Sequence, residues 1–370
     1  MNDLRITFLR AGELENFIAS EEYRRMPVVP ISPQRARSQG RNPRAQPDDI
    51  ALTLAYAGDE MVGYLGAVPD CFFPDGATPQ RMAWLSCLWI SPSQRGKGLA
   101  KKLLHAMLEV WQNRVILTEF TPEVKNLYDR TAALHESEAL WGFRGYLRPN
   151  FAQILPPKKA FWQKIRPLLR LADAFLAAPN ALRIRLLHSA KMPGPVRYLS
   201  ATDKAADAFI ASHTGAQLAR RDAVVLEWML QYPWVTEAPF EDVMSQRYHF
   251  TSTARQFKTW LLSLLDDEGR DSAILLLTLR EGHLRVPHAW FPDTATARVA
   301  QCIFAHAIAS GARMLTLYHP RLAVWCRENR HPFFATKRVR RSYFVGSGLE
   351  EIRIHQPLNL QDGDGDAAFT

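Results

Sequence analysis

The hydrophobic pattern of the chain changes period once between Met82 and Trp111. Residues 82–90 are almost continuously apolar and include β-favouring tryptophan and isoleucine, which predicts a strand buried on both faces. After the polar residues 91–94, apolar side chains recur at steps of three and four, namely Leu99, Leu103, Leu104, Met107, Leu108 and Trp111. This spacing predicts an amphipathic helix. We therefore expect a buried strand that leads through a short polar loop into a helix.

The loop between this strand and this helix, Arg95–Ala100, reads Arg-Gly-Lys-Gly-Leu-Ala. The first turn of a helix has N–H groups without partners and carries the positive end of the helix dipole. Glycine lets the backbone approach a phosphate closely, and Arg95 and Lys97 add full positive charges. The pattern therefore predicts a pyrophosphate site, with a basic surface turn as the alternative. A dinucleotide fingerprint is excluded because Lys101 replaces its third glycine.

The same loop satisfies the pattern Arg/Gln-x-x-Gly-x-Gly/Ala, and here the chain resembles the GNAT superfamily of acyl-CoA-dependent N-acyltransferases. A second segment is similar to a later helix of that family. Leu127-Tyr128 and Arg130 match the family pattern, whereas Ala132-Ala133 replaces the Gly-Phe that usually follows. The two segments together predict a GNAT domain in the N-terminal part of the chain.

The resemblance implies a cofactor, acetyl-CoA or another acyl-CoA, and no metal. In this family the pantetheine arm would contact the backbone of Leu88, Trp89 and Ile90, and the pyrophosphate would lie on Arg95, Gly96, Lys97, Gly98, Leu99 and Ala100. Tyr128 would be the general acid that protonates the leaving thiolate. The general base is expected to be Glu119, with His135, Glu136 or a water chain as alternatives.

The order of predicted elements indicates two similar domains. Residues 1–153 read as strand, helix, hairpin, strand, helix, strand and helix, with an irregular Pro- and Arg-rich loop over 24–49 and a closing strand region over 141–155. Residues 196–358 repeat this order. Their turn over 292–296 has no glycine or cation, which predicts a second, degenerate GNAT-like domain without a pyrophosphate loop. The fold class is α/β (α+β), with a mixed, mostly antiparallel sheet in each domain.

Two further segments differ in character from the domains. Residues 154–195 are basic and apolar together, with expected breaks at Pro167 and Pro179. They predict a helical linker, and the pattern over 158–188 also fits a helix on an anionic membrane surface. Residues 359–370 alternate Asp and Gly, which predicts a flexible, solvated tail.

Composition adds little that is specific. The chain is 47% hydrophobic and 22% charged, with a formal net charge of +9 that suits an anionic cofactor. The four cysteines form no metal-like pair, and no signal or membrane-spanning segment is recognised, so we expect a cytoplasmic protein. No zinc module or RNA-binding motif suggests a nucleic-acid partner.

Taken together, these patterns predict an N-acyltransferase, most simply an N-acetyltransferase, that transfers an acyl group to the primary amine of a small molecule or peptide. The alternatives are a non-catalytic CoA-binding sensor or scaffold, and an enzyme that uses long-chain acyl-CoA or an acyl-carrier protein. The sequence does not identify the acceptor or the oligomeric state.

Overall fold

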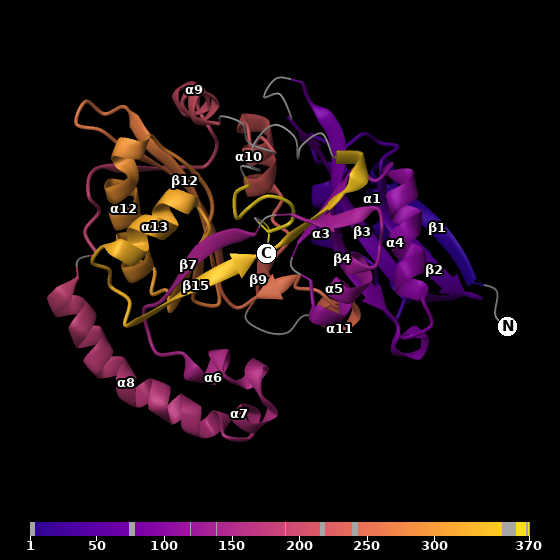
Figure 1. The fold of residues 1–370 in the computed structure, drawn as a ribbon, viewed down its shortest axis with the longest axis horizontal. Coiled ribbons are helices and arrows are strands. Elements are labelled where there is room, and N and C mark those ends of the chain that lie inside the picture. The colour runs from indigo at the N-terminus through magenta and orange to yellow at the C-terminus, as the bar shows by residue number, and fades with distance from the viewer. Residues whose placement is uncertain are drawn as a thin grey trace. The chain divides into compact units, whose positions relative to one another are not determined.

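The computed structural model describes residues 4–73, 78–118, 120–137, 139–188, 190–214, 219–238, 243–349, 360–367 and 369. It divides into two compact units, each built from separate stretches of the chain (Figure 1). Unit 1 draws on Met1–Leu140, Ser200–Phe257 and Arg341–Thr370, and unit 2 on Trp141–Leu199 and Lys258–Arg340.

Unit 1 is organised around a seven-stranded sheet in the order β1-β2-β3-β4-β5-β16-β6. Its strands are β1 (Leu4–Arg10), β2 (Ile50–Ala57), β3 (Glu60–Phe72), β4 (Gln80–Ile90), β5 (Val115–Thr118), β16 (Tyr343–Gly346) and β6 (Leu134–Glu136). Only the central pair β4 and β5 is parallel among the pairings of this sheet. The predicted buried strand over 82–90 is thus confirmed as the middle of the sheet.

Helices cover both faces of this sheet (Figure 1). On one face lie α4 (Leu99–Val110) and α5 (Pro122–Asp129), whose apolar side chains pack on Leu85 and Leu117. The other face is covered by α1 (Leu14–Ala19), α2 (Glu21–Arg25) and α3 (Pro33–Gly40). Unit 1 also contains α9 (Lys204–His213), α10 (Ala223–Gln231), α11 (Val243–Arg247) and the short pair β9 (Thr236–Glu237) and β10 (Thr253–Ala254).

The helix α3 corrects the prediction of an irregular loop over 24–49. Ser32 caps the helix by accepting a hydrogen bond from the Arg35 backbone N–H, and Pro33 occupies its first turn. Both residues are favoured at these positions. The prediction was wrong because six arginines and several prolines dominated the composition of the segment. The consequence is functional, since α3 carries the buried side chain of Arg35.

Unit 2 has a second seven-stranded sheet, in the order β15-β7-β14-β13-β12-β11-β8. Its strands are β15 (Ala335–Arg341), β7 (Leu140–Tyr146), β14 (Met314–Leu317), β13 (His283–Trp290), β12 (Asp271–Arg280), β11 (Phe257–Leu265) and β8 (Val196–Leu199). Its helices are α6 (Phe151–Ile154), α7 (Ala160–Lys164), α8 (Arg166–Leu187), α12 (Thr296–Ala309) and α13 (Pro320–Glu328). The β13–β14 pair is parallel, as β4–β5 is in unit 1. Two mostly antiparallel sheets flanked by helices confirm the predicted fold class.

Each sheet contains one strand from the other half of the sequence. β7 pairs with β14 from Tyr146–Met314 to Phe143–Leu317, and β16 pairs with β5 from Tyr343–Thr118 to Val345–Ile116. The predicted closing strand of the first domain therefore lies in unit 2, and the end of the chain completes unit 1. For this reason the compact units do not follow the predicted ranges 1–153 and 196–358.

The segment over 154–195 is helical, as predicted, but Pro179 does not break it. α8 runs through this proline from Arg166 to Leu187 and belongs to unit 2. Pro167 lies in the first turn of α8, where proline is tolerated because its missing N–H has no helical partner. In the part of the chain that the structure describes, no helix is both long enough and apolar enough to cross a bilayer.

Candidate functional site

The loop from β4 to α4 has the backbone geometry of an anion-binding turn. Gly96 and Gly98 both have φ = +78°, a region that side-chain-bearing residues rarely adopt, and Gly98 is the N-cap of α4. A Cβ built on either glycine meets no atom within 4 Å. The first backbone bond of the helix runs from the Lys102 N–H to the Gly98 carbonyl at 3.2 Å. The N–H groups of Arg95 and Lys97 bond to the Pro92 and Gln94 carbonyls, whereas the first-turn N–H groups of α4 that precede Lys102 have no partner within the helix and can meet an anion.

Positive charge surrounds this turn. Arg95, Lys97, Lys101 and Lys102 are exposed there. Arg95 is held at the base of the loop, where its Nε donates to the Ile90 carbonyl at 3.3 Å. The turn therefore combines free amides, the positive helix end and full charges, which is what a diphosphate requires.

A β-bulge interrupts β4 three residues before its end. Gly66 of β3 pairs with Ser86, but Tyr64 pairs with Trp89, so one residue of β3 faces both Cys87 and Leu88. Cys87 has φ = 61°, the left-handed conformation that produces the bulge. The pairing of β4 with β5 ends at the preceding Leu85–Leu117 pair, among the residues described. The two central strands therefore separate where the bulge begins.

The bulge sets the direction of the amides at the end of β4. Ser91 N–H donates to the Val62 carbonyl at 2.9 Å, so alternate residues of β4 bond to β3. Trp89 is one of these, and the N–H groups of Leu88 and Ile90 therefore point away from β3, towards the side of β5. The three residues predicted to contact pantetheine thus divide into two with outward amides and one that is paired within the sheet.

Tyr128 lies in the core on the α4–α5 face. Its ring contacts Phe120 and Phe344 at centroid distances of 5.8 and 5.4 Å. Burial raises the pKa of the Tyr128 phenol well above its usual range. The group therefore stays protonated at neutral pH, which suits a proton donor and excludes a phenolate base.

The groups expected to act as the base are Glu119, with His135 and Glu136 as alternatives. Glu119 lies outside the described residues. Glu136 accepts a hydrogen bond from Lys125 Nζ at 2.8 Å, and His135 pairs with Val345 between β6 and β16. Both alternatives are therefore parts of the sheet edge.

A polar cluster lies at the bulge, on the face covered by α1–α3. The Arg35 guanidinium is 4% exposed and places Nη1 at 2.5 Å from Cys87 Sγ and 3.4 Å from Tyr248 Oη. The Trp234 ring lies 4.1 Å from the same guanidinium. Burial opposes the charge of Arg35, but its attraction to Cys87, Tyr248 and Asp366 outweighs burial and raises the pKa of the guanidinium. This side chain remains a cation inside unit 1.

The C-terminal segment Leu360–Phe369 contradicts the prediction of a solvated tail. Asp362 lies 2.7 Å from Arg341, and Asp364 lies 3.6 Å from Arg221. Phe369 stacks on Trp234 with a centroid distance of 4.4 Å. Each of these acidic residues pairs with a buried arginine, so this segment packs against unit 1 and is not solvated. We call the described residues of 360–369 the strap.

The strap passes directly over β4. A Cβ on Gly365 would lie 2.9 Å from Trp84 Cε3, so only glycine fits this approach. The carboxylate of the next residue, Asp366, contacts the hydroxyl of Ser86. Ser86 is the last residue of β4 before the bulge. A carboxylate thus reaches the bulge of the central strand from the far end of the chain.

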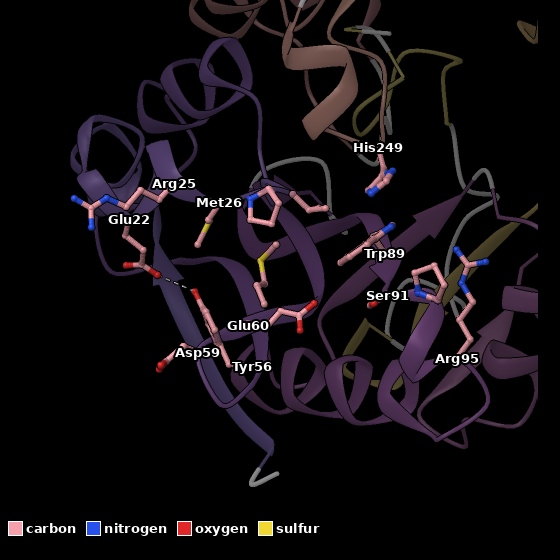
Figure 2. Close-up of a pocket in the computed structure, with 14 residues that line it drawn as sticks. Glu22, Arg25, Met26, Tyr56, Asp59, Glu60, Trp89, Ser91, Arg95 and His249 are labelled. Atoms are coloured by element: carbon pink, nitrogen blue, oxygen red, sulfur yellow. Dashed lines mark hydrogen bonds between the residues drawn. The ribbon is translucent and has the colours of Figure 1, made fainter.

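A pocket of about 760 Å³ opens on the same face, beside the end of β4 (Figure 2). The rings of Trp89 and His249 stack with a centroid distance of 4.8 Å and form one wall of the pocket. Arg95 also lines the pocket. Figure 2 shows Glu22 and Glu60 on the side away from His249, and Glu22 accepts a hydrogen bond from Tyr56. Burial, and then the charge of Arg95, lower the pKa of His249, so its imidazole is neutral at pH 7.

Sequence reasoning did not find Arg35, Tyr248, His249 or Asp366. Two local signals existed, the Ser32-Pro33 helix start and the Asp-Gly alternation. Neither indicates which distant residue is contacted. Tyr248 and His249 carry no local signal, because their position depends on a segment more than 150 residues away from β4 in sequence.

Residues 16–136 match the model of the acetyltransferase (GNAT) family. This part of the chain is similar to GNAT acetyltransferase domains. The match covers the bulged strand β4, the pyrophosphate-type loop and the helix that carries Tyr128. GNAT proteins are acyltransferases that use acyl-CoA, which agrees with an anion-binding turn at the end of the central strand.

Solved structures of similar fold cover nearly the whole chain. A GCN5-related N-acetyltransferase from Kribbella flavida matches 94% of this chain and 72% of its own, with 14% identity and a TM-score of 0.50. The N-myristoyltransferase of Saccharomyces cerevisiae, solved with bound myristoyl-CoA, matches 93% of this chain and 83% of its own, with 9% identity and a TM-score of 0.50. At these identities the likeness concerns the fold.

No curated protein sequence matches the chain. Among the residues described, no group of three or more His, Cys, Asp or Glu side chains is arranged to hold a metal ion.

Proposed function

We propose that this GNAT protein transfers an acyl group, most simply acetyl, from CoA to a primary amine by direct attack within a ternary complex. The observation that carries the proposal is the conjunction of two features on one strand. The bulge at Cys87 opens β4 away from β5, and the glycine turn with free amides follows at the end of the same strand. A thioester and its diphosphate need these two features in this order.

In this proposal the pyrophosphate binds Arg95–Ala100, and the pantetheine arm lies along the outward amides of Leu88 and Ile90. The same amides stabilise the oxyanion of the tetrahedral intermediate. The acceptor enters from the pocket lined by Trp89 and His249, on the opposite side of the bulge from α4 and α5. Holding both reactants side by side supplies much of the rate gain.

Proton transfer follows from the buried groups. The amine nitrogen forms a bond to the thioester carbon, and the bond from carbon to sulfur breaks. Tyr128 protonates the leaving thiolate. We propose that Asp366, through its contact with Ser86, accepts the proton that the amine nitrogen loses. Asp366 is a candidate base beside Glu119, because its carboxylate contacts Ser86 at the bulged end of β4.

Calorimetric titration with acetyl-CoA, followed by thiol release over a panel of primary amines, tests the function. We expect saturable binding and release that depends on one class of amine. Binding without release on any amine would favour a CoA sensor. Absence of binding would refute the proposal. Repeating the titration with myristoyl-CoA measures donor length, and tighter binding than acetyl-CoA would assign a long-chain donor.

A further inference from the structure

A stripe of large apolar side chains runs along α8 and is not covered by unit 2. The five residues are Leu168, Leu171, Phe175, Leu182 and Leu186, which are 61%, 67%, 81%, 56% and 71% exposed. At 3.6 residues per turn, their positions fall within an arc of about 60° around the helix. Exposed apolar residues in a continuous stripe differ from the single exposed ones that are normal on a protein surface.

The opposite face of α8 holds the helix on unit 2. Asp173 accepts hydrogen bonds from the backbone N–H groups of Phe151 and Ala152 at 2.7 and 3.0 Å. Asn180 donates to the Leu147 carbonyl at 3.0 Å, and Ile184 is buried in the core of the unit. The helix therefore has a defined inner face, and the stripe is an apolar face on the other side of the helix.

Cations outnumber acidic residues in this segment. The cations are Lys158, Lys159, Lys164, Arg166, Arg170, Arg183 and Arg185, and the only acidic residue over 158–188 is Asp173. Asp173 already caps α6 from the inner face. Around the helix, Arg185 lies beside the stripe, Arg166 and Arg170 lie towards the inner face, and Arg183 donates to Asn180 Oδ1 and the Pro332 carbonyl. The stripe therefore has the exposed Arg185 beside it, and the exposed lysines at 158, 159 and 164 precede the helix.

We infer that α8 lies on an anionic lipid surface, with the stripe in the acyl boundary and the flanking cations among the headgroups. Burying a few large apolar side chains while several cations meet negative headgroups is the pattern of interfacial helices. A second copy of this chain is a poorer occupant, because two such helices would bring their like charges together. This inference is independent of the acyltransferase proposal.

Sedimentation of the full chain with lipid vesicles tests the inference. The probes are vesicles of phosphatidylcholine alone and vesicles in which about a quarter of the lipid is phosphatidylglycerol. We expect binding to the anionic vesicles only, and weaker binding at high salt. Phe175→Glu should weaken binding by roughly tenfold or more, and Arg185→Glu should also weaken it.

Val224→Glu is the matched control, since Val224 is an exposed apolar residue of α10 in unit 1. It should leave vesicle binding unchanged. Thermal unfolding of each variant checks that the fold is retained, which is expected because Phe175 is exposed. Failure to bind anionic vesicles, or equal binding by Phe175→Glu, would overturn the inference. Dimerisation that Phe175→Glu abolishes, in the absence of lipid binding, would assign the stripe to a second copy instead.

Discussion

The carboxylate of Asp366 contacts the hydroxyl of Ser86, although the two residues are 280 positions apart in the chain. Ser86 immediately precedes Cys87, where β4 bulges and leaves β5. The C-terminal strap thereby brings an acidic group to a strand that carries no carboxylate near its bulge. The relationship links the end of the chain to the proposed reaction.

Asp366→Asn should lower turnover by roughly a hundredfold while leaving acetyl-CoA affinity nearly unchanged, because it removes a proton acceptor and keeps the hydrogen bond to Ser86. In the wild type the rate should fall at low pH as the base becomes protonated, and this fall should be absent in the variant. Hydroxylamine or water can serve as the nucleophile, so the measurement does not depend on the natural acceptor.

Asp362→Asn is the control for a purely structural effect of the strap. Asp362 lies in the same strap and pairs with Arg341. This variant should keep the wild-type pH profile. Equal turnover by Asp366→Asn and wild type would remove Asp366 from the reaction, while acetyl-CoA binding and release would still support the function.

Gly98→Asp should weaken acetyl-CoA binding by roughly a hundredfold or more, because it places a carboxylate where the diphosphate lies. Gly269→Asp is a matched control. Gly269 also has φ = +78° and open space around a built Cβ, but it lies in the turn before β12. Both substitutions impose similar backbone strain, so equal affinities in titration would contradict the pyrophosphate site.

Tyr128→Phe should reduce turnover by roughly a hundredfold and change acetyl-CoA affinity little. The ring contacts with Phe120 and Phe344 remain, so we expect a loss of unfolding free energy below about 1 kcal/mol. Steady-state kinetics and denaturant unfolding measure the two effects. An unchanged rate would exclude Tyr128 as the acid.

Gly365→Ala should loosen the strap. The new Cβ clashes with Trp84, and the alanine must adopt the backbone angle φ = +76° of Gly365. Backbone strain costs about 1–2 kcal/mol, and overpacking adds about 1–3 kcal/mol. Gly269→Ala carries the same strain without a clash. Carboxypeptidase should therefore digest the Gly365→Ala variant faster than the Gly269→Ala variant, and equal rates would show that the strap is not held at Trp84.

Asp364 makes the stability of unit 1 depend on pH. Burial raises the pKa of Asp364 to about 7, although the charge of Arg221 opposes this. In the unfolded chain the pKa returns to about 3.9. The folded state therefore holds the extra proton between these values, and the free energy of unfolding falls as pH rises from about 4 to 7. Asp364→Asn should remove this part of the slope in denaturant titrations from pH 4 to 8. An identical slope would place the titration elsewhere.

The local features of the site could be predicted from the sequence. The apolar run over 82–90, the glycines at 96 and 98 and the periodic helix after them predicted β4, the loop and α4, and all three are present. These features depend on residues close in sequence, since side-chain periodicity and backbone freedom act over one strand or one turn. The predicted helix break at Pro179 was wrong, because contacts with distant residues of unit 2, such as the bond from Asn180 to the Leu147 carbonyl, maintain α8.

Which distant segments complete the site could not be predicted, because it depends on long-range packing. The exchange of β7 and β16 between the sheets, the burial of Arg35 beside Cys87 and the docking of Asp366 on Ser86 all join positions far apart in the chain. Arginine and aspartate are usually solvated, so composition predicts a loop and a tail for 24–49 and 359–370. Arg35, Asp362 and Asp364 are buried here because each meets a specific partner, and the free energy of such pairing exists only once the sheet has formed.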